Sequence, residues 1–195
     1  DEQEGLREEA RQREYAWLTG DVRAEDRAAQ YGHRAAIVLF TGSAQTGKTF
    51  LARRVEALLV ADSRHAYLLE GENLLQGLDA DLSAADPSFA AERVRRYGEV
   101  ARLLIDTGLI VVSTSKTFGI NYQRMAEMIR TLVQPAPVLS VHMSRAGEEA
   151  PPNTDLHFAG PQDFDAAARQ ILEELKRRGV LIQPSGTKST IQYSI

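Results

Sequence analysis

Residues 36–49 of the chain read AIVLFTGSAQTGKT, and this stretch indicates the fold. The first five residues are a continuous apolar run, which is typical of a β-strand covered on both of its faces. The next eight residues are Gly42, Ser43, Ala44, Gln45, Thr46, Gly47, Lys48 and Thr49. They match the pattern Gly-x-x-x-x-Gly-Lys-Thr, and apolar residues at helical spacing follow at once. A strand, this loop and a helix in direct succession predict a phosphate-binding P-loop; the alternative, a chance glycine-rich turn, is uncommon in such a setting.

Four residues of this loop would carry its chemistry. Gly42 and Gly47 permit the backbone angles that let successive N–H groups point inward at a phosphate. The helix that begins near Lys48 adds its unpaired N–H groups and the positive end of its dipole. The Lys48 ammonium can reach the β- and γ-phosphates of a nucleotide, and the Thr49 hydroxyl is placed to bind Mg²⁺. We therefore predict that the chain binds ATP or a close relative, with Mg²⁺ as the cofactor.

Strands alternate with helices along the rest of the chain. Further short apolar strands are expected at residues 65–69, 109–112, 138–142 and 155–158. Four helices are expected. The first begins near Lys48, the second ends near Gly108, the third spans residues 121–133 and the fourth runs from Pro161 to Gly179. This alternation predicts an α/β fold, namely a P-loop NTPase-type three-layer sandwich whose parallel sheet has about five strands.

The composition of each segment predicts the domain organisation. Residues 1–20 are densely charged and have few apolar positions, which predicts a helical arm or linker. Residues 21–182 contain all the regular patterns and are expected to form the P-loop domain. Residues 183–195 are polar and are expected to be a C-terminal tail.

The composition of the whole chain excludes several kinds of function. The chain has 195 residues, a net charge of −4 and no long basic run, so we expect no nucleic-acid partner. No apolar run approaches the roughly 20 residues of a membrane-spanning helix, so we expect no membrane partner. The absence of cysteine excludes disulfides and cysteine-based metal sites, and the four histidines show no metal-ligand spacing. A cytoplasmic location fits these observations.

Acidic residues after the second expected strand indicate a kinase. The Asn-Lys-x-Asp motif that reads guanine is absent, and no aspartate follows the third expected strand. Residues 69–73 instead read LEGEN, which puts carboxylates at a strand end beside the P-loop. In a small-molecule kinase such a carboxylate orients the acceptor hydroxyl or a magnesium-bound water. We predict Lys48 and Glu70 as catalytic residues, with a solvated carboxylate as the alternative for Glu70.

Several further motifs resemble those of the adenylylsulfate kinase family. Residues 67–73 (YLLEGEN) resemble the family's Tyr-Leu-Leu-Asp-Gly-Asp-Asn, and residues 77–82 (GLDADL) resemble its Gly-Leu-Asn-x-Asp-Leu. Residues 95–101 and 106–111 match the following helix and strand, and residues 22–27 resemble the family's lead-in to its first strand. The likeness extends over about residues 21–180. The resemblance implies transfer of the γ-phosphoryl group of ATP to the 3′-hydroxyl of adenylylsulfate, in sulfate activation. It also suggests a homodimer and association with, or fusion to, other sulfate-activation domains.

Departures from the family pattern cluster in the half that would bind the acceptor. Leu75 stands where the family has an arginine, Arg93 stands where it has an asparagine, and the lid segment near residues 145–153 is much shorter. The candidate acceptor contacts are Glu72, Asn73, Arg95, Arg96 and Lys116, each with a solvated surface role as the alternative. Two hypotheses remain open. One is a kinase acting on adenylylsulfate or a related small anionic acceptor; the other is a catalytically weak, nucleotide-binding regulatory domain of a larger sulfate-activating protein.

Overall fold

The computed structural model describes residues 20–114, 122–160 and 163–182. The predicted arm (except Gly20) and the predicted tail therefore lie outside the described residues. The elements are α2 (Ala24–Tyr31), β1 (Ala36–Gly42), α3 (Lys48–Ala61), β2 (Ala66–Glu70), α4 (Gly71–Leu74), α5 (Phe89–Asp106), β3 (Ile110–Thr114), α6 (Tyr122–Val133), β4 (Val138–Ser144), β5 (Leu156–Ala159) and α7 (Phe164–Arg177). None of the helices in this described part is long and apolar enough to cross a membrane.

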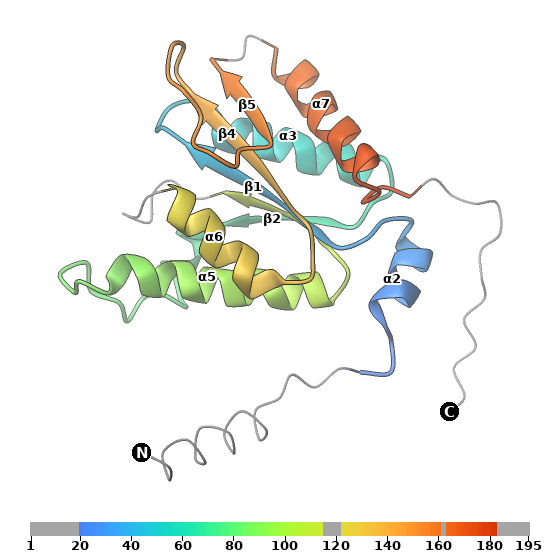
Figure 1. The fold of residues 1–195 in the computed structure, drawn as a ribbon. Coiled ribbons are helices and arrows are strands. Elements are labelled where there is room, and N and C mark those ends of the chain that lie inside the picture. The colour runs from blue at the N-terminus through green and yellow to red at the C-terminus, as the bar shows by residue number, and fades with distance from the viewer. Residues whose placement is uncertain (1–19, 115–121, 161–162, 183–195) are drawn as a thin grey trace.

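The five strands form one parallel sheet in the order β2-β3-β1-β4-β5. β1 lies in the middle, where Val38 is opposite Val112 of β3 and Leu139 of β4, and all seven residues of β1 are buried. Helices α3 and α7 lie on one side of the sheet, and α5 and α6 lie on the other (Figure 1). The predicted three-layer α/β sandwich is therefore confirmed.

The side chains of β1 are divided between two core layers. Val38 and Phe40 pack with residues of α3 and α7, whereas Ile37 and Leu39 pack with residues of α5 and α6. One strand supplies both layers because successive side chains point to opposite faces of a sheet. The continuous apolar run in the sequence is the direct consequence of helices covering both faces.

The topology brings the loops after β1, β2 and β4 to one edge of the sheet. All neighbouring strands are parallel, so their carboxyl ends lie at the same edge. Open α/β sheets bind their ligands at this edge. The P-loop follows β1, the carboxylates of residues 70 and 72 lie at the end of β2, and a short loop at residues 145–155 follows β4.

Three helices differ from the sequence-based expectations. Helix α7 begins at Phe164 rather than at Pro161, because the Asp163 side chain accepts a hydrogen bond from the Ala166 N–H at 2.9 Å and caps the helix there. Helices α2 and α4 are not expected from apolar periodicity, because α2 buries no residue fully and α4 has only four residues.

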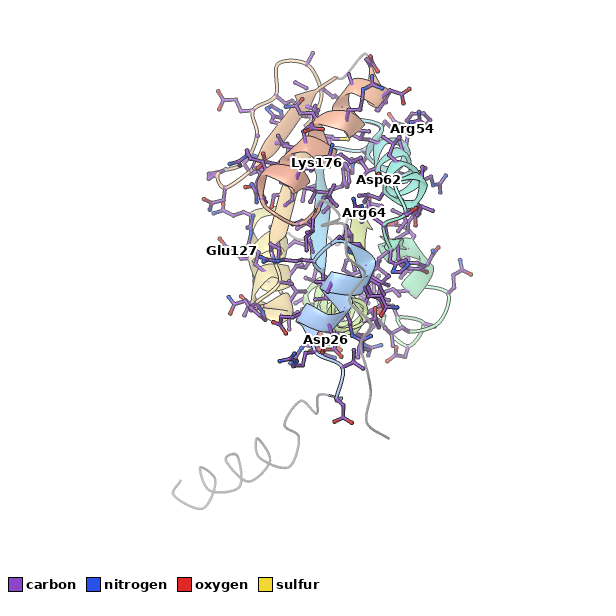
Figure 2. All side chains as sticks on the ribbon, turned by 90° about the vertical axis from the view of Figure 1, so that its right-hand side faces the viewer. Asp26, Arg54, Asp62, Arg64, Glu127 and Lys176 are labelled. Carbon is purple, nitrogen blue, oxygen red and sulfur yellow. The ribbon has the colours of Figure 1, made fainter. Side chains whose placement is uncertain are left out.

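Arg64 ties α2 to the rest of the domain. The Arg64 side chain is labelled in Figure 2. Its guanidinium donates hydrogen bonds to the carbonyl oxygen of Gly32, which caps α2, and to that of Ile182 at 3.1 Å. The Ile182 N–H in turn donates to the Gly32 carbonyl at 3.0 Å. These contacts join the end of α2 to the last described residues of the domain, at the end of the sheet opposite the P-loop.

Candidate functional site

Both glycines of the P-loop have positive φ angles and a close neighbour. Gly42 has a φ of +124°, and a Cβ atom there would lie 1.8 Å from the carbonyl oxygen of Met143. Gly47 has a φ of +86°, and its Cβ atom would lie 2.7 Å from the ring of Phe164. Residues with a side chain are strained at positive φ. The backbone angle therefore favours glycine at both positions, and at Gly42 the backbone of Met143 also leaves no room for a side chain.

Lys48 is buried inside the loop, with only 6% of its surface exposed. Its ammonium group donates hydrogen bonds to the carbonyl oxygens of Gly42 at 2.8 Å and Ser43 at 2.5 Å. Burial lowers the pKa of Lys48 below its ordinary value, and the negative charge of Glu72 opposes this shift. The loop thus holds a buried cation in contact with its own backbone, and a carboxylate from another element acts on that cation.

The short loop after β4 is hydrogen-bonded to the P-loop. Ser43 Oγ donates to Glu148 Oε2 at 3.1 Å, although the two residues are 105 positions apart. The same carboxylate oxygen accepts the Arg145 N–H at 3.0 Å, and the Ser43 N–H donates to the Met143 carbonyl at 3.2 Å. Sequence reasoning missed Glu148, because a single glutamate in a loop carries no local sign of its partner.

The two glutamates at the end of β2 have different partners. Glu70 Oε1 accepts a hydrogen bond from Arg53 Nη2 of α3 at 3.1 Å. Glu72 lies in α4, and its charge acts on the Lys48 ammonium. Asn73, the next residue of α4, is exposed. The lysine of the P-loop is therefore coupled to Glu72, whereas Glu70 is paired with an arginine.

Tyr97 of α5 holds the end of β2 in place. Its hydroxyl donates to the Leu69 carbonyl oxygen at 2.7 Å and lies 2.7 Å from Ser113 Oγ of β3. Burial raises the pKa of Tyr97, and the negative charges of Glu72 and Glu70 raise it further. The phenol consequently stays protonated at neutral pH and links α5, β2 and β3 next to the two glutamates.

A magnesium ion would depend on the nucleotide for most of its ligands. Among the residues that the structure describes, no group of three or more His, Asp or Glu side chains is placed to hold a metal ion. Thr49 lies in the first turn of α3, directly after Lys48, and is half-buried. Mg²⁺ is usually held by one or two protein oxygens together with phosphate oxygens and water. A single hydroxyl next to a phosphate-binding loop fits this pattern.

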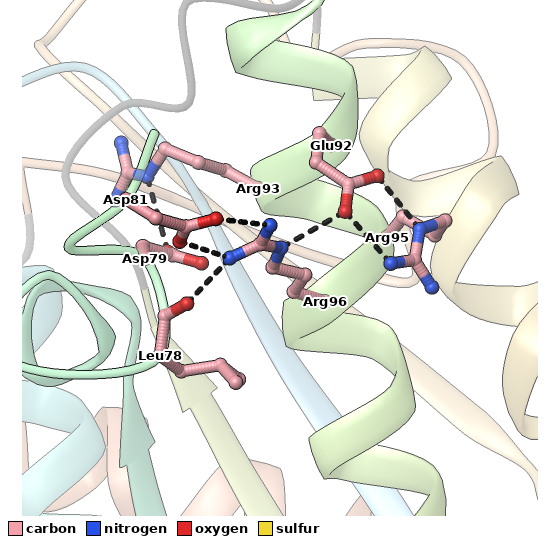
Figure 3. A network of polar contacts seen from close by, with 7 residues as sticks. All are labelled: Leu78, Asp79, Asp81, Glu92, Arg93, Arg95 and Arg96. Atoms are coloured by element: carbon pink, nitrogen blue, oxygen red, sulfur yellow. Dashed lines mark hydrogen bonds and ion pairs between the residues drawn. The ribbon is translucent and has the colours of Figure 1, made fainter. Parts of the chain in front are cut away.

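Figure 3 shows that the two arginines predicted to contact the acceptor are bonded to carboxylates of the chain itself. Arg95 donates to both carboxylate oxygens of Glu92, each at 2.7 Å. Arg96 donates to Glu92 Oε1 at 2.9 Å and to the two oxygens of Asp81 at 2.5 and 2.9 Å. Lys116, the other predicted basic contact, lies outside the described residues. An anionic acceptor would compete with Glu92 and Asp81 for these guanidinium groups.

Arg93 forms a buried ion pair next to this network. Its Nε atom lies 3.4 Å from Asp79 Oδ2, and the two side chains are 6% and 0% exposed. Its guanidinium also lies over the ring of Phe89, 5.5 Å from the ring centroid. Removing one partner of such a pair leaves a buried charge behind, which costs about 3–5 kcal/mol. Arg93 is therefore part of the folded framework of this half of the site.

We expect the Glu92→Gln variant to have a lower free energy of unfolding than the parent above pH 4.5. Near pH 2 the two free energies should become similar. Hydrogen bonds from Arg95 and Arg96 lower the pKa of Glu92 from 4.5 to about 2 in the folded chain. A carboxylate with a lowered folded pKa stabilises the fold above its ordinary pKa, and this contribution is lost as the pH falls through the folded pKa. Urea unfolding across this pH range measures the difference.

The control for this prediction is Glu173→Gln, because the exposed Glu173 accepts a single hydrogen bond from Lys176 at 2.8 Å. Exposed pairs of this kind contribute little to stability. We expect a small effect from the control at every pH. A difference between the parent and Glu92→Gln that does not change with pH would contradict the role assigned to the Glu92 charge.

Comparison with known proteins gives one consistent family. A family model described as adenylylsulphate kinase matches residues 34–155. The chain is 28% identical to an adenylyl-sulfate kinase of Yersinia pestis, over 85% of this chain and 89% of that protein. It is 38% identical to an adenylyl-sulfate kinase of Shewanella amazonensis, over 66% of this chain and 63% of that protein. A solved point mutant of the Mycobacterium tuberculosis APS kinase superposes with a TM-score of 0.64 at 29% identity, over 74% of this chain and 99% of that one.

The matched segment contains the main features of the candidate site. Residues 34–155 include the whole P-loop, the two glutamates after β2 and the arginine network of α5. The family model covers more than half of the chain, and the fold superposes on that of a solved APS kinase. The chain therefore belongs to the adenylylsulphate kinase family.

Proposed function

We propose that this protein is an ATP-dependent kinase of the adenylylsulfate kinase type, which transfers the γ-phosphoryl group of Mg-ATP to the hydroxyl group of an acceptor. One observation carries the proposal: the Lys48 ammonium is buried inside the P-loop and bonded to carbonyl oxygens of Gly42 and Ser43, and the negative charge of Glu72 at the end of β2 raises its pKa. Phosphoryl transfer depends chiefly on positioning and charge neutralisation. This pair offers a cation for the transferred group and an anion for the acceptor hydroxyl.

Each group of the site has a role in the proposed reaction. Lys48 neutralises the β- and γ-phosphates, while the backbone N–H groups of the loop hold them in place. Thr49 supplies a hydroxyl ligand to the magnesium ion, which neutralises phosphate charge when it is bound. A carboxylate after β2 orients the acceptor hydroxyl. Glu70 and Glu72 are the two candidates for that role, and the coupling to Lys48 favours Glu72.

Adenylylsulfate is the first acceptor to test, because the two similar proteins from Yersinia and Shewanella are both named adenylyl-sulfate kinases. Transfer would take place at its 3′-hydroxyl. Arg95 and Arg96 would have to exchange bonds with Glu92 or Asp81 for bonds with this anion. Each exchange gains only the difference in free energy between two charge-assisted hydrogen bonds. We therefore expect a weaker affinity for adenylylsulfate than unpaired arginines would provide.

The same arginine network favours a second candidate function, a nucleotide-binding domain with little catalytic activity that regulates a larger sulfate-activating protein. In such a domain the P-loop would keep its residues for binding alone. The bonds among Arg95, Arg96, Glu92 and Asp81 would then serve to hold the segment before α5 onto that helix, with no acceptor to displace them.

A direct assay separates the two functions. Turnover of Mg-ATP is followed with adenylylsulfate present and absent, and the 3′-phosphorylated product is identified by chromatography. We expect product formation that depends on both substrates. Tight ATP binding by calorimetry together with no product at high enzyme concentration would remove adenylylsulfate as the acceptor and support the regulatory function. Rapid turnover would eliminate the regulatory function.

A further inference from the structure

Phe50 is an exposed aromatic residue next to the P-loop. It directly follows Thr49 in the first turn of α3, and 61% of its surface is exposed, more than for any other large apolar side chain in the described part of the chain. Exposed apolar surface of this size is unfavourable in water. A large exposed aromatic ring beside a phosphate-binding loop is therefore a candidate contact for the rest of the nucleotide.

Phe50 rests on a second aromatic ring that is anchored in the domain. The rings of Phe50 and Phe164 meet edge to face, with their centroids 5.0 Å apart at an angle of 74°. Phe164, the first residue of α7, packs against the core layer between α3, α7 and the sheet. Its ring also lies against Gly47, where an added Cβ atom would come within 2.7 Å. The pair of rings thus forms a wall beside the loop.

The helices that carry the two rings are joined by an ion pair. Arg54, one turn after Phe50, donates a hydrogen bond to Asp165, the residue after Phe164, at 2.6 Å. This contact and the apolar packing between α3 and α7 do not depend on the exposed face of Phe50. The ring is therefore presented on a rigid support.

The sheet order indicates which end of a nucleotide would reach this wall. β1 and its P-loop lie in the middle, with β2 on one side and β5 on the other. The β2 side carries Glu70 and Glu72, the two candidates to orient the acceptor hydroxyl in the proposed function, so the γ-phosphate would face that side. Phe164 follows β5 on the opposite side. The nucleoside of the phosphoryl donor would then extend from the P-loop on the side opposite the acceptor. Phe164 and the Phe50 ring that contacts it lie on that side.

We propose that the exposed face of Phe50, supported by Phe164, stacks on the base of the phosphoryl donor and contributes a large part of its affinity. The proposal rests on the proposed function, because it requires the phosphates to lie in the P-loop. Stacking of a base on an aromatic side chain corresponds to about a 5- to 150-fold gain in affinity. The Phe50 ring would contact the flat face of the base, whereas the P-loop would bind the phosphates.

The test compares two ligands that share the phosphates and differ in the base. Calorimetry with Mg²⁺ measures the binding of ATP and of tripolyphosphate to the parent, Phe50→Ala, Phe50→Leu and Phe50→Tyr. We expect Phe50→Ala to bind ATP about 5- to 150-fold more weakly and tripolyphosphate as the parent does. Phe50→Tyr should retain the ATP affinity of the parent because it keeps an aromatic face. Phe50→Leu should lose most of the ATP affinity that stacking contributes.

The matched control is Val60→Ala, because Val60 is another exposed apolar residue of α3, 55% exposed, at the far end of the helix. We expect the control to bind both ligands as the parent does. Equal weakening of ATP and tripolyphosphate by Phe50→Ala would overturn the proposal, since the ring would then only shape the loop. Unchanged ATP binding by Phe50→Ala or Phe50→Leu would overturn it as well. A parent that binds neither ligand would refute the proposed function itself, which is a different result.

Discussion

The Lys48→Ala variant is expected to bind Mg-ATP about 10²- to 10⁴-fold more weakly than the parent, and to form no measurable product. This range corresponds to the loss of two charge-assisted hydrogen bonds to the phosphates, each worth about 1.5–3 kcal/mol. Lys48 is only 6% exposed, so little solvent screens its charge. Calorimetric titration with a nonhydrolysable ATP analogue measures the affinity directly.

The folding of the Lys48→Ala variant has to be measured alongside its binding. The substitution removes the donor to the carbonyl oxygens of Gly42 and Ser43, which then need another partner. Thermal unfolding without ligand reports this cost separately from the loss of affinity. The control is Lys176→Ala, because Lys176 is an exposed lysine of α7 paired with Glu173. ATP affinity equal to that of the parent in a folded Lys48→Ala variant would refute the P-loop assignment, and the kinase proposal with it.

The Glu72→Gln variant is expected to lower kcat about 10²- to 10⁴-fold, the range usually contributed by a positioned acid or base. Glu72 lies in α4 directly after β2, and its negative charge raises the pKa of Lys48, which favours it over Glu70 for this role. The matched variant Glu70→Gln changes a carboxylate that is already paired with Arg53, and we expect a loss of less than about tenfold. Steady-state kinetics with adenylylsulfate provide kcat and KM for both variants.

The pH dependence of ATP binding provides a second readout for Glu72. Burial lowers the pKa of Lys48, and the charge of Glu72 opposes that shift, so Glu72→Gln should lower the pKa of Lys48 further. ATP binding weakens as Lys48 loses its proton with rising pH. This loss should begin at a lower pH in Glu72→Gln than in the parent or in Glu70→Gln. Equal kinetic and pH effects of the two glutamine variants would contradict the distinction between the glutamates.

Much of the fold follows from local patterns in the sequence. The apolar run before Gly42, the glycine loop and the helical spacing after Lys48 each lie within one continuous segment, and the structure confirms the strand and the helix on either side of the loop. The other four strands lie within about two residues of their expected positions. Local patterns are sufficient here because a strand covered on both faces must be apolar throughout. Local patterns locate the ends of helices less accurately, as the start of α7 at Phe164 instead of Pro161 shows.

The sequence by itself determined the P-loop, the parallel sheet and the resemblance to one kinase family, because these depend on residues close together in the chain. Only the tertiary structure decided which glutamate is coupled to Lys48, that Arg95 and Arg96 are bonded to carboxylates, and that Phe50 meets Phe164. Each of these depends on which helices and loops pack beside one another. Contacts between distant segments leave no periodic pattern in either segment, so only the assembled sheet and its covering helices reveal them.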